Sequence, residues 1–206
     1  MDTFLYLESQ LNNENEEEPE AGFCNSLDTK SDNDFQLKRT CKSFVKLFKL
    51  LKKQCGNECS TDKSKYFEFM NYWLNYKLRS IAKYDYIKTN FYKELQTKYL
   101  DSEAHSILYR KIYDIKVDTY KNMYILYKLY KIIDKIKEGT IEYKTGIVEF
   151  KTDYNNAFKQ CFLETNDNLY NALEQFRKYY EKKVSYIKSC TNGECPTLPQ
   201  LINKFQ

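Results

Sequence analysis

Residues 65–78 read KYFEFMNYWLNYKL, a run rich in large apolar side chains. Within it, Phe67, Met70, Leu74 and Leu78 recur three or four positions apart, which is the spacing of one face of an α-helix. The whole chain of 206 residues holds five Gly and three Pro, too few for the many turns of a β-sandwich or barrel. The run and the scarcity of turn residues predict an all-α protein.

Outward from this run, the same periodicity predicts further helices on both sides. The longest spans 102–138 and would measure about 50 Å at the helical rise, the alternative being a bend near Asp118. We expect it to be the long central helix of an irregular multi-helix bundle stabilised by disulfides. The other predicted helices cover residues 3–11, 32–54, 64–78, 85–99, 145–163 and 167–189.

Charge is distributed unevenly along the chain. Residues 1–35 hold ten acidic side chains and one Lys, although the net charge is +4. We predict an acidic N-terminal segment, 1–34, packed on or tethered to a helical body, 35–195, which is followed by a tail, 196–206. The first residues lack the basic flank and apolar run of a signal peptide, and no stretch is long enough to cross a bilayer. Membrane attachment would therefore need a segment absent from this chain.

Cysteines are the main candidate site residues. Cys55 and Cys59 bracket a Gly-Asn turn, and Cys190 and Cys195 bracket an Asn-Gly turn, which suits short disulfide loops. Zinc fits less well, because zinc sites favour two intervening residues and the single histidine is remote. Buried thiols in a cytosolic protein are the third alternative. The disulfide candidates are Cys24, Cys41, Cys55, Cys59, Cys161, Cys190 and Cys195.

The position of Cys161 in the predicted helices limits which cysteine it could form a disulfide with. It lies near the turn between the last two predicted helices, whereas Cys190 lies at the far end of that hairpin. About 30 Å would separate them, which is beyond the reach of a disulfide. We therefore expect Cys161 to pair with another segment, such as the 24–59 region. The odd number of cysteines leaves at least one thiol, or one bond to another chain.

No pattern of residues predicts catalysis or a cofactor. His105 has no Ser or Cys nucleophile beside it, and a Gly-rich phosphate-binding loop is absent. Asp114, Asp118 and Asp134 occur at helical spacing, but the Glu-x-x-His motif of di-iron bundles is missing. We predict that the chain is not an enzyme and that it binds no cofactor and no metal.

Aromatic residues are the remaining candidates for recognition. Trp73, among Phe and Met at helical spacing, is typical of a core anchor. Tyr next to Lys, as at Tyr127 and Lys128, could follow a nucleic-acid backbone, but Arg, which dominates base reading, occurs four times against 29 Lys. We therefore predict no nucleic-acid partner. A tyrosine stripe, more typical of half-buried packing than of a ligand platform, comprises Tyr113, Tyr120, Tyr124, Tyr127 and Tyr130.

The segment NYWLNYKL at 71–78 resembles the LNYWLN signature of the Plasmodium interspersed repeat (PIR) superfamily, whose vivax members are called VIR proteins. Its family-motif core here is Tyr72, Trp73 and Leu74. The resemblance covers about 20–195 and includes the composition, rich in Lys, Asn, Tyr and Ile.

The order of the cysteines is also similar to that of the family. Cys24 and Cys41 precede the motif, whereas Cys161, a Tyr-bearing helix and Cys190 follow it. Many members carry a cysteine just before the motif, where Phe67-Glu68-Phe69 stand here, and Cys55 or Cys59 would substitute for it.

The resemblance implies a variant surface antigen of a malaria parasite. Such a protein would be exported to the infected red cell and displayed on its surface as a helical ectodomain, anchored when full length by a transmembrane segment. It would bind a host cell-surface receptor for adhesion or immune evasion and would have no enzymatic activity. The alternative is an intracellular helical scaffold or trafficking adaptor.

Overall fold

The chain forms two compact units, residues 1–120 and residues 121–206. The structure is a computed structural model in which the described residues form helices and no strand, so the predicted all-α multi-helix fold is confirmed. The predicted segments 1–34, 35–195 and 196–206 stay a prediction. The described residues are 2–12, 19–27, 33–56, 65–81, 85–99, 104, 107–108, 110–163, 167–184, 187 and 195–198.

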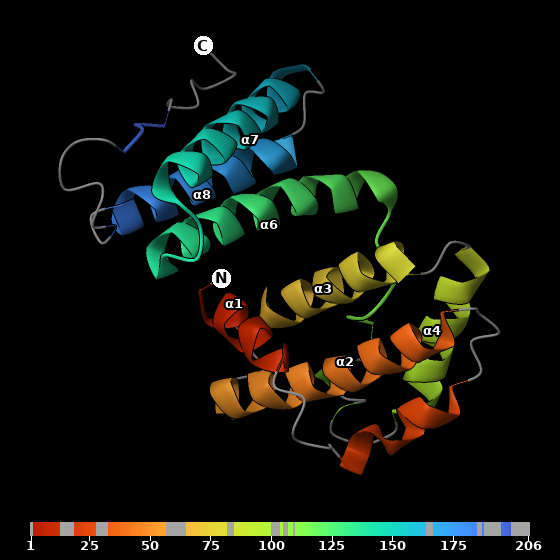
Figure 1. The fold of residues 1–206 in the computed structure, drawn as a ribbon. Helices are drawn as coiled ribbons and strands as arrows, with labels where there is room; N and C mark the ends of the chain where they lie inside the picture. The colour runs from red at the N-terminus through yellow and green to blue at the C-terminus, as the bar shows by residue number, and fades with distance from the viewer. Residues whose placement is uncertain are drawn as a thin grey trace. The chain divides into compact units, whose positions relative to one another are not determined.

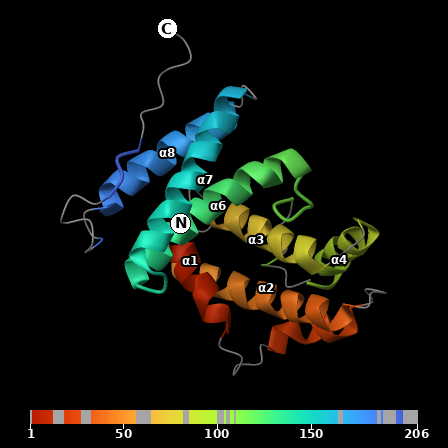
Figure 2. The ribbon, with the colours of Figure 1, turned by 45° about the horizontal axis from the view of Figure 1, so that its top comes forward.

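The first unit is built around two antiparallel helices, α2 and α3, that lie side by side in Figures 1 and 2. The turn of 3-10 helix η2 also packs on α2. Phe44, Phe67 and Trp73 are among the largest side chains buried in this core. The elements of the unit are α1 (Asp2–Ser9), η1 (Gln10–Asn12), η2 (Pro19–Ser26), α2 (Asp34–Cys55), α3 (Lys65–Ile81) and α4 (Asp85–Lys98).

Helix α2 begins and ends where its sequence favours a helix boundary. Asp34 in the first turn and Lys52 and Lys53 in the last turn complement the helix dipole. Gly56 follows with a φ of 52°, a left-handed conformation that glycine adopts without steric cost. The predicted helix end at residue 54 is therefore confirmed to within one residue.

The predicted helix over 102–138 is the main correction to the fold. Helix α6 (Val117–Glu138) covers only its second part, because residues 110–116 form a turn and an extended segment. The predicted bend near Asp118 is thus a full interruption just before it. Hydrogen bonds from α3 hold the interrupted backbone, as described below.

The second unit contains α6 from Lys121 onward, α7 (Tyr143–Leu163) and α8 (Asp167–Val184). Helices α7 and α8 pack on one another as the predicted hairpin. Their contact is aromatic: the Phe150 ring stacks on Tyr180 with centroids 5.0 Å apart and lies 5.9 Å from the Phe176 ring.

The disulfide bond between Cys24 and Cys41 joins η2 to α2. Cys55 and Cys195 are disulfide-bonded as well. Cys59 and Cys190, their predicted partners, lie outside the described residues, so those pairings stay predictions.

Cys161 does not follow the sequence-based expectation. It is a buried thiol in the core of the second unit, so the expected disulfide to the 24–59 region is wrong. The physical reason lies in its helix: Cys161 shares the apolar face of α7 with Phe150, Tyr154 and Ala157, and that face packs within its own unit. A thiol at such a position behaves as a small apolar side chain.

Candidate functional site

The family-motif core lies inside the first unit. Tyr72, Trp73 and Leu74 on α3 are all at most 2% exposed, so these side chains face the protein interior rather than a ligand. The prediction that Trp73 is a core anchor is confirmed. The three motif residues therefore contribute to the packing of the first unit.

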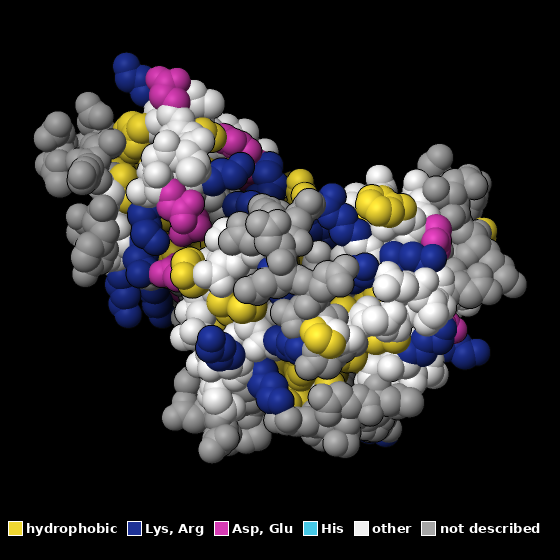
Figure 3. All heavy atoms as spheres, turned by 60° about the horizontal axis from the view of Figure 1, so that its bottom comes forward, with side chains coloured by type: hydrophobic (Ala, Val, Ile, Leu, Met, Phe, Trp, Pro, Cys, Tyr) yellow, Lys and Arg dark blue, Asp and Glu magenta, His cyan; other side chains and the backbone are white. Residues whose placement is uncertain are grey.

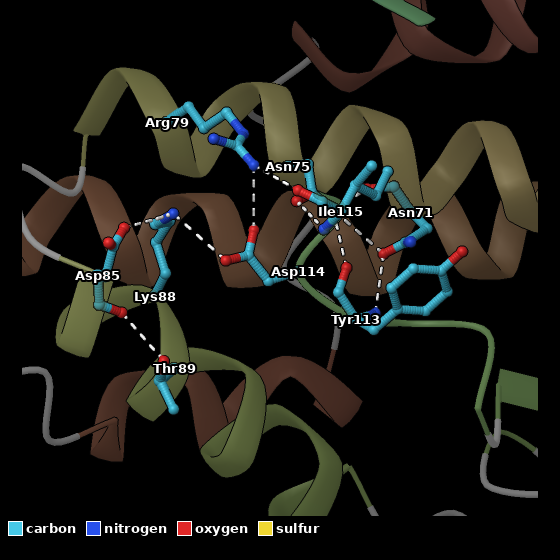
Figure 4. A network of polar contacts seen from close by, with 9 residues as sticks. All are labelled: Asn71, Asn75, Arg79, Asp85, Lys88, Thr89, Tyr113, Asp114 and Ile115. Atoms are coloured by element: carbon cyan, nitrogen blue, oxygen red, sulfur yellow. Dashed lines mark hydrogen bonds and ion pairs between the residues drawn. The ribbon is translucent and has the colours of Figure 1, made fainter. Parts of the chain in front are cut away.

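Two asparagines that flank the motif core make the most distinctive contacts of the unit. Asn71 and Asn75 are 2% and 1% exposed and lie one helical turn apart on α3. The Asn71 Oδ1 accepts a hydrogen bond of 3.0 Å from the backbone N–H of Tyr113. The Asn75 Oδ1 accepts one of 2.9 Å from Ile115, while its Nδ2 donates to the Tyr113 carbonyl at 2.9 Å. Figure 4 shows both side chains directed at this extended backbone.

The asparagine pair explains why the predicted long helix is interrupted. Backbone groups buried away from water need hydrogen-bond partners, and those of Tyr113 and Ile115 find side chains of α3 instead of a helical ladder. Gln96 on α4 donates a further hydrogen bond of 3.0 Å to the Ile112 carbonyl. The 110–116 segment is therefore bound to α3 and α4 by side chains that compete with helix formation.

An ion-pair cluster lies beside the asparagine pair. The Arg79 Nη2 is 2.5 Å from the Ile115 carbonyl and 3.3 Å from Asp114 Oδ1. The Lys88 Nζ lies 3.3 Å from Asp114 Oδ2 and 2.8 Å from Asp85 Oδ1, and its side chain is only 8% exposed. The hydrogen bond from Lys88 lowers the pKa of Asp85 below its ordinary value. This cluster neutralises an almost buried ammonium group and fixes the segment to α4.

Helix α6 starts against the same helix face. The Arg79 guanidinium lies 4.4 Å from the centre of the Tyr120 ring, and that ring stacks on Tyr72 with centroids 5.7 Å apart. Cation–π and stacking contacts of this kind stabilise the first turn of α6 on α3.

The tyrosines of the predicted stripe differ in how deeply they are buried. Tyr127 is buried, Tyr120 and Tyr130 are half-buried, and Tyr113 and Tyr124 are exposed. Tyr113 and Val117 are each 55% exposed, and the Tyr113 ring lies outside the hydrogen-bond network in Figure 4. Tyr113 belongs to the bound segment and Val117 follows it directly, and we refer to these two exposed apolar residues as the exposed pair.

In the second unit, ion pairs join neighbouring helical turns or neighbouring helices. Arg177 on α8 binds Glu174 at 2.6 Å and also Glu181, and the hydrogen bond from Arg177 lowers the pKa of Glu174. Lys128 on α6 lies 2.8 Å from Asp153 on α7, and this hydrogen bond raises the pKa of Lys128. These pairs connect neighbouring turns or neighbouring helices.

The acidic residues considered as metal ligands do not form a common site. Asp114 lies outside a helix and pairs with Arg79 and Lys88, while Asp134 on α6 pairs with Lys137 at 3.5 Å. His105 lies outside the described residues. Among those that are described, no three His, Cys, Asp or Glu side chains gather in a way that could hold a metal.

On the face that Figure 3 draws, dark-blue Lys and Arg side chains are spread over the surface, with yellow hydrophobic side chains between them and magenta Asp and Glu side chains at several places. Within the part of the chain that the structure describes, none of the helices is both long and apolar enough to cross a membrane.

Comparison with known proteins adds no relative to this picture. No family model matches the chain, and neither the curated proteins nor the solved structures contain a match.

Proposed function

We propose that this chain is the binding domain of a variant surface antigen of the PIR type, which contacts a host cell-surface receptor. The proposal rests on the resemblance of the 71–78 motif and on one structural observation, the disulfide bonding of Cys24, Cys41, Cys55 and Cys195. Structural disulfides persist in oxidising compartments and are rare in the cytosol, so they favour display outside a cell over a cytosolic scaffold.

The structure describes only part of the loops that we expect to contact a partner. Exposed loops at 12–34, 56–64 and 190–200 are expected to contact a partner, but most of their residues lie outside those described. The exposed pair Tyr113 and Val117 offers a contact surface that the structure does describe. Tyrosine on a rigid support is favourable at an interface, because it buries a large area while losing little side-chain entropy.

The oxidation state of the cysteines tests whether the protein resides in an oxidising compartment. Protein taken from its native location is denatured without reductant, alkylated and mapped by mass spectrometry. We expect label on Cys161 and none on Cys24 or Cys41. Label on all seven cysteines would instead favour the intracellular scaffold.

A receptor screen tests the binding function itself. The folded domain is displayed as a multimer against human cell-surface proteins, and any hit is repeated with Tyr113→Ser. Tyr86→Ser is the matched control, because Tyr86 on α4 is also 55% exposed. We expect Tyr113→Ser to weaken binding by about 1–2 kcal/mol and Tyr86→Ser to leave it unchanged. Equal effects of both variants would exclude this contact surface.

A further inference from the structure

A cavity of about 330 Å³ lies within the first unit and has no role in the functions considered so far. Its described lining comes from α2, α4 and residues between 99 and 112, and its volume is in the range of small-molecule sites. The residues that line it are Phe44, Leu95, Gln96, Tyr99, Ala104, Leu108, Arg110 and Ile112.

Most of the described residues that line the cavity are apolar and belong to the core of the first unit. Phe44 is fully buried, and Leu95, Ala104 and Ile112 are at most 4% exposed. Covering apolar surface of this kind with an apolar group is favourable, because it removes that surface from water. An apolar chain is therefore the chemistry that fits this part of the cavity.

Among the described lining residues, the charged one is Arg110, which has an unusual backbone conformation. Arg110 has a φ of 60°, and among the described residues it is the only non-glycine residue with positive φ. Backbone conformations of this kind persist where surrounding structure imposes them, and they cluster at functional sites. Arg110 is an exposed residue. Its guanidinium has five N–H donors in a planar fork that matches a carboxylate, so it can hold one besides its other contacts.

Gln96 connects this wall to the bound 110–116 segment. Its Nε2 donates to the Ile112 carbonyl at 3.0 Å, which fixes the side chain and holds Ile112 against α4. The cavity is thus formed in advance by the same contacts that interrupt the long helix, and a ligand would not have to open it.

We propose that this cavity binds a small amphiphile with one apolar chain and one carboxylate. The chain lies against Phe44, Leu95 and Ile112, and the carboxylate binds the Arg110 guanidinium. This inference is independent of the proposed receptor binding, since it concerns a small molecule inside the first unit.

Calorimetric titration of the full chain with sodium decanoate tests the proposal, with 1-decanol and decyltrimethylammonium as probes of the same chain length. We expect decanoate to bind at least about tenfold more tightly than either, because only the carboxylate pairs with guanidinium. No heat from decanoate up to about 1 mM would overturn the proposal, as would equal affinity for the three probes.

Variants of the lining residues locate the site. Arg110→Asn removes the charge but tolerates positive φ, so decanoate affinity should fall about tenfold while decanol affinity stays constant. Arg110→Lys should retain most of the decanoate binding. Arg39→Asn, which removes an exposed charge from α2 outside the cavity wall, is the matched control and should bind as the native chain does. Unchanged decanoate binding by Arg110→Asn would overturn the assignment.

Filling the cavity separates binding inside it from adsorption to the surface. Ala104→Leu places three more carbons in the space and should abolish binding of both decanoate and decanol. Leu108→Phe is the second variant if Ala104→Leu does not fold, as judged by Trp73 fluorescence. Decanoate binding that survives in a folded, filled variant would overturn the proposal.

Discussion

Asn75→Ala should be among the most destabilising polar substitutions in the first unit. The change leaves the Ile115 N–H and the Tyr113 carbonyl without their 2.9 Å partners, and the first of these bonds is buried. An unsatisfied buried group costs about 1–3 kcal/mol, so the two losses together predict about 2–6 kcal/mol. The free energy of unfolding is measured by urea titration of Trp73 fluorescence, which reports the first unit because Trp73 is the single tryptophan of the chain.

Asn33→Ala is the matched control for this experiment. Asn33 also donates to a backbone carbonyl, that of Ile81, at 2.8 Å, and the loss of a part-buried bond of this kind predicts about 1 kcal/mol. Hydrogen exchange adds a local measurement, because the Ile115 amide should lose protection only in Asn75→Ala. If both variants cost the same and the Ile115 amide stays protected, the asparagine pair does not hold the segment.

Three further predictions concern other parts of the chain. Cys41→Ser opens a disulfide across 17 residues and should lower the free energy of unfolding of the first unit by about 3 kcal/mol in urea titrations. Gly146→Ala places a Cβ 2.7 Å from Ile136 Cγ1, so it should cost about 1–2 kcal/mol by circular dichroism, and less in an Ile136→Ala background. Because Arg177 lowers the pKa of Glu174, this pair stabilises the fold above the ordinary pKa of 4.5 and the stabilisation is lost as pH falls. Glu174→Gln should therefore show a smaller stability difference between neutral and acidic pH, and an unchanged difference would contradict the assignment.

Helical periodicity was enough to predict the fold class and most helices. The apolar spacing in 65–78 and 145–163 predicted α3 and α7, and Gly56 and Gly139 lie where α2 and α6 end. These features depend on local sequence, so they can be read without knowledge of distant contacts.

The interruption at 110–116 could not be predicted in the same way. Its residues continue the helical pattern, with Ile112 and Ile115 both buried in the structure. What stops the helix is a set of side chains about 40 positions away in the sequence, on α3. The available signal was two asparagines one turn apart inside an apolar helix, since buried amides at such positions need partners.

The position of Cys161 was mispredicted for a related reason. Helical geometry excluded Cys190 as a partner of Cys161, and we expected a bond to another segment, although the odd number of cysteines required one thiol to remain. Ring packing in the second unit, from Phe150, Phe176 and Tyr180, gives the Cys161 side chain an apolar environment instead.

The asparagine pair recognises main-chain atoms, and this has a consequence for how the surface can diversify. The amide and carbonyl of residue 113 are identical in nearly every amino acid, so the grip of Asn71 and Asn75 does not depend on which side chain stands there. Residue 113 can therefore change its outward chemistry from aromatic to charged to small while its backbone keeps the same anchorage. A protein selected for a variable surface would gain from such a position, because a substitution there changes the exposed side chain and leaves the buried hydrogen bonds in place.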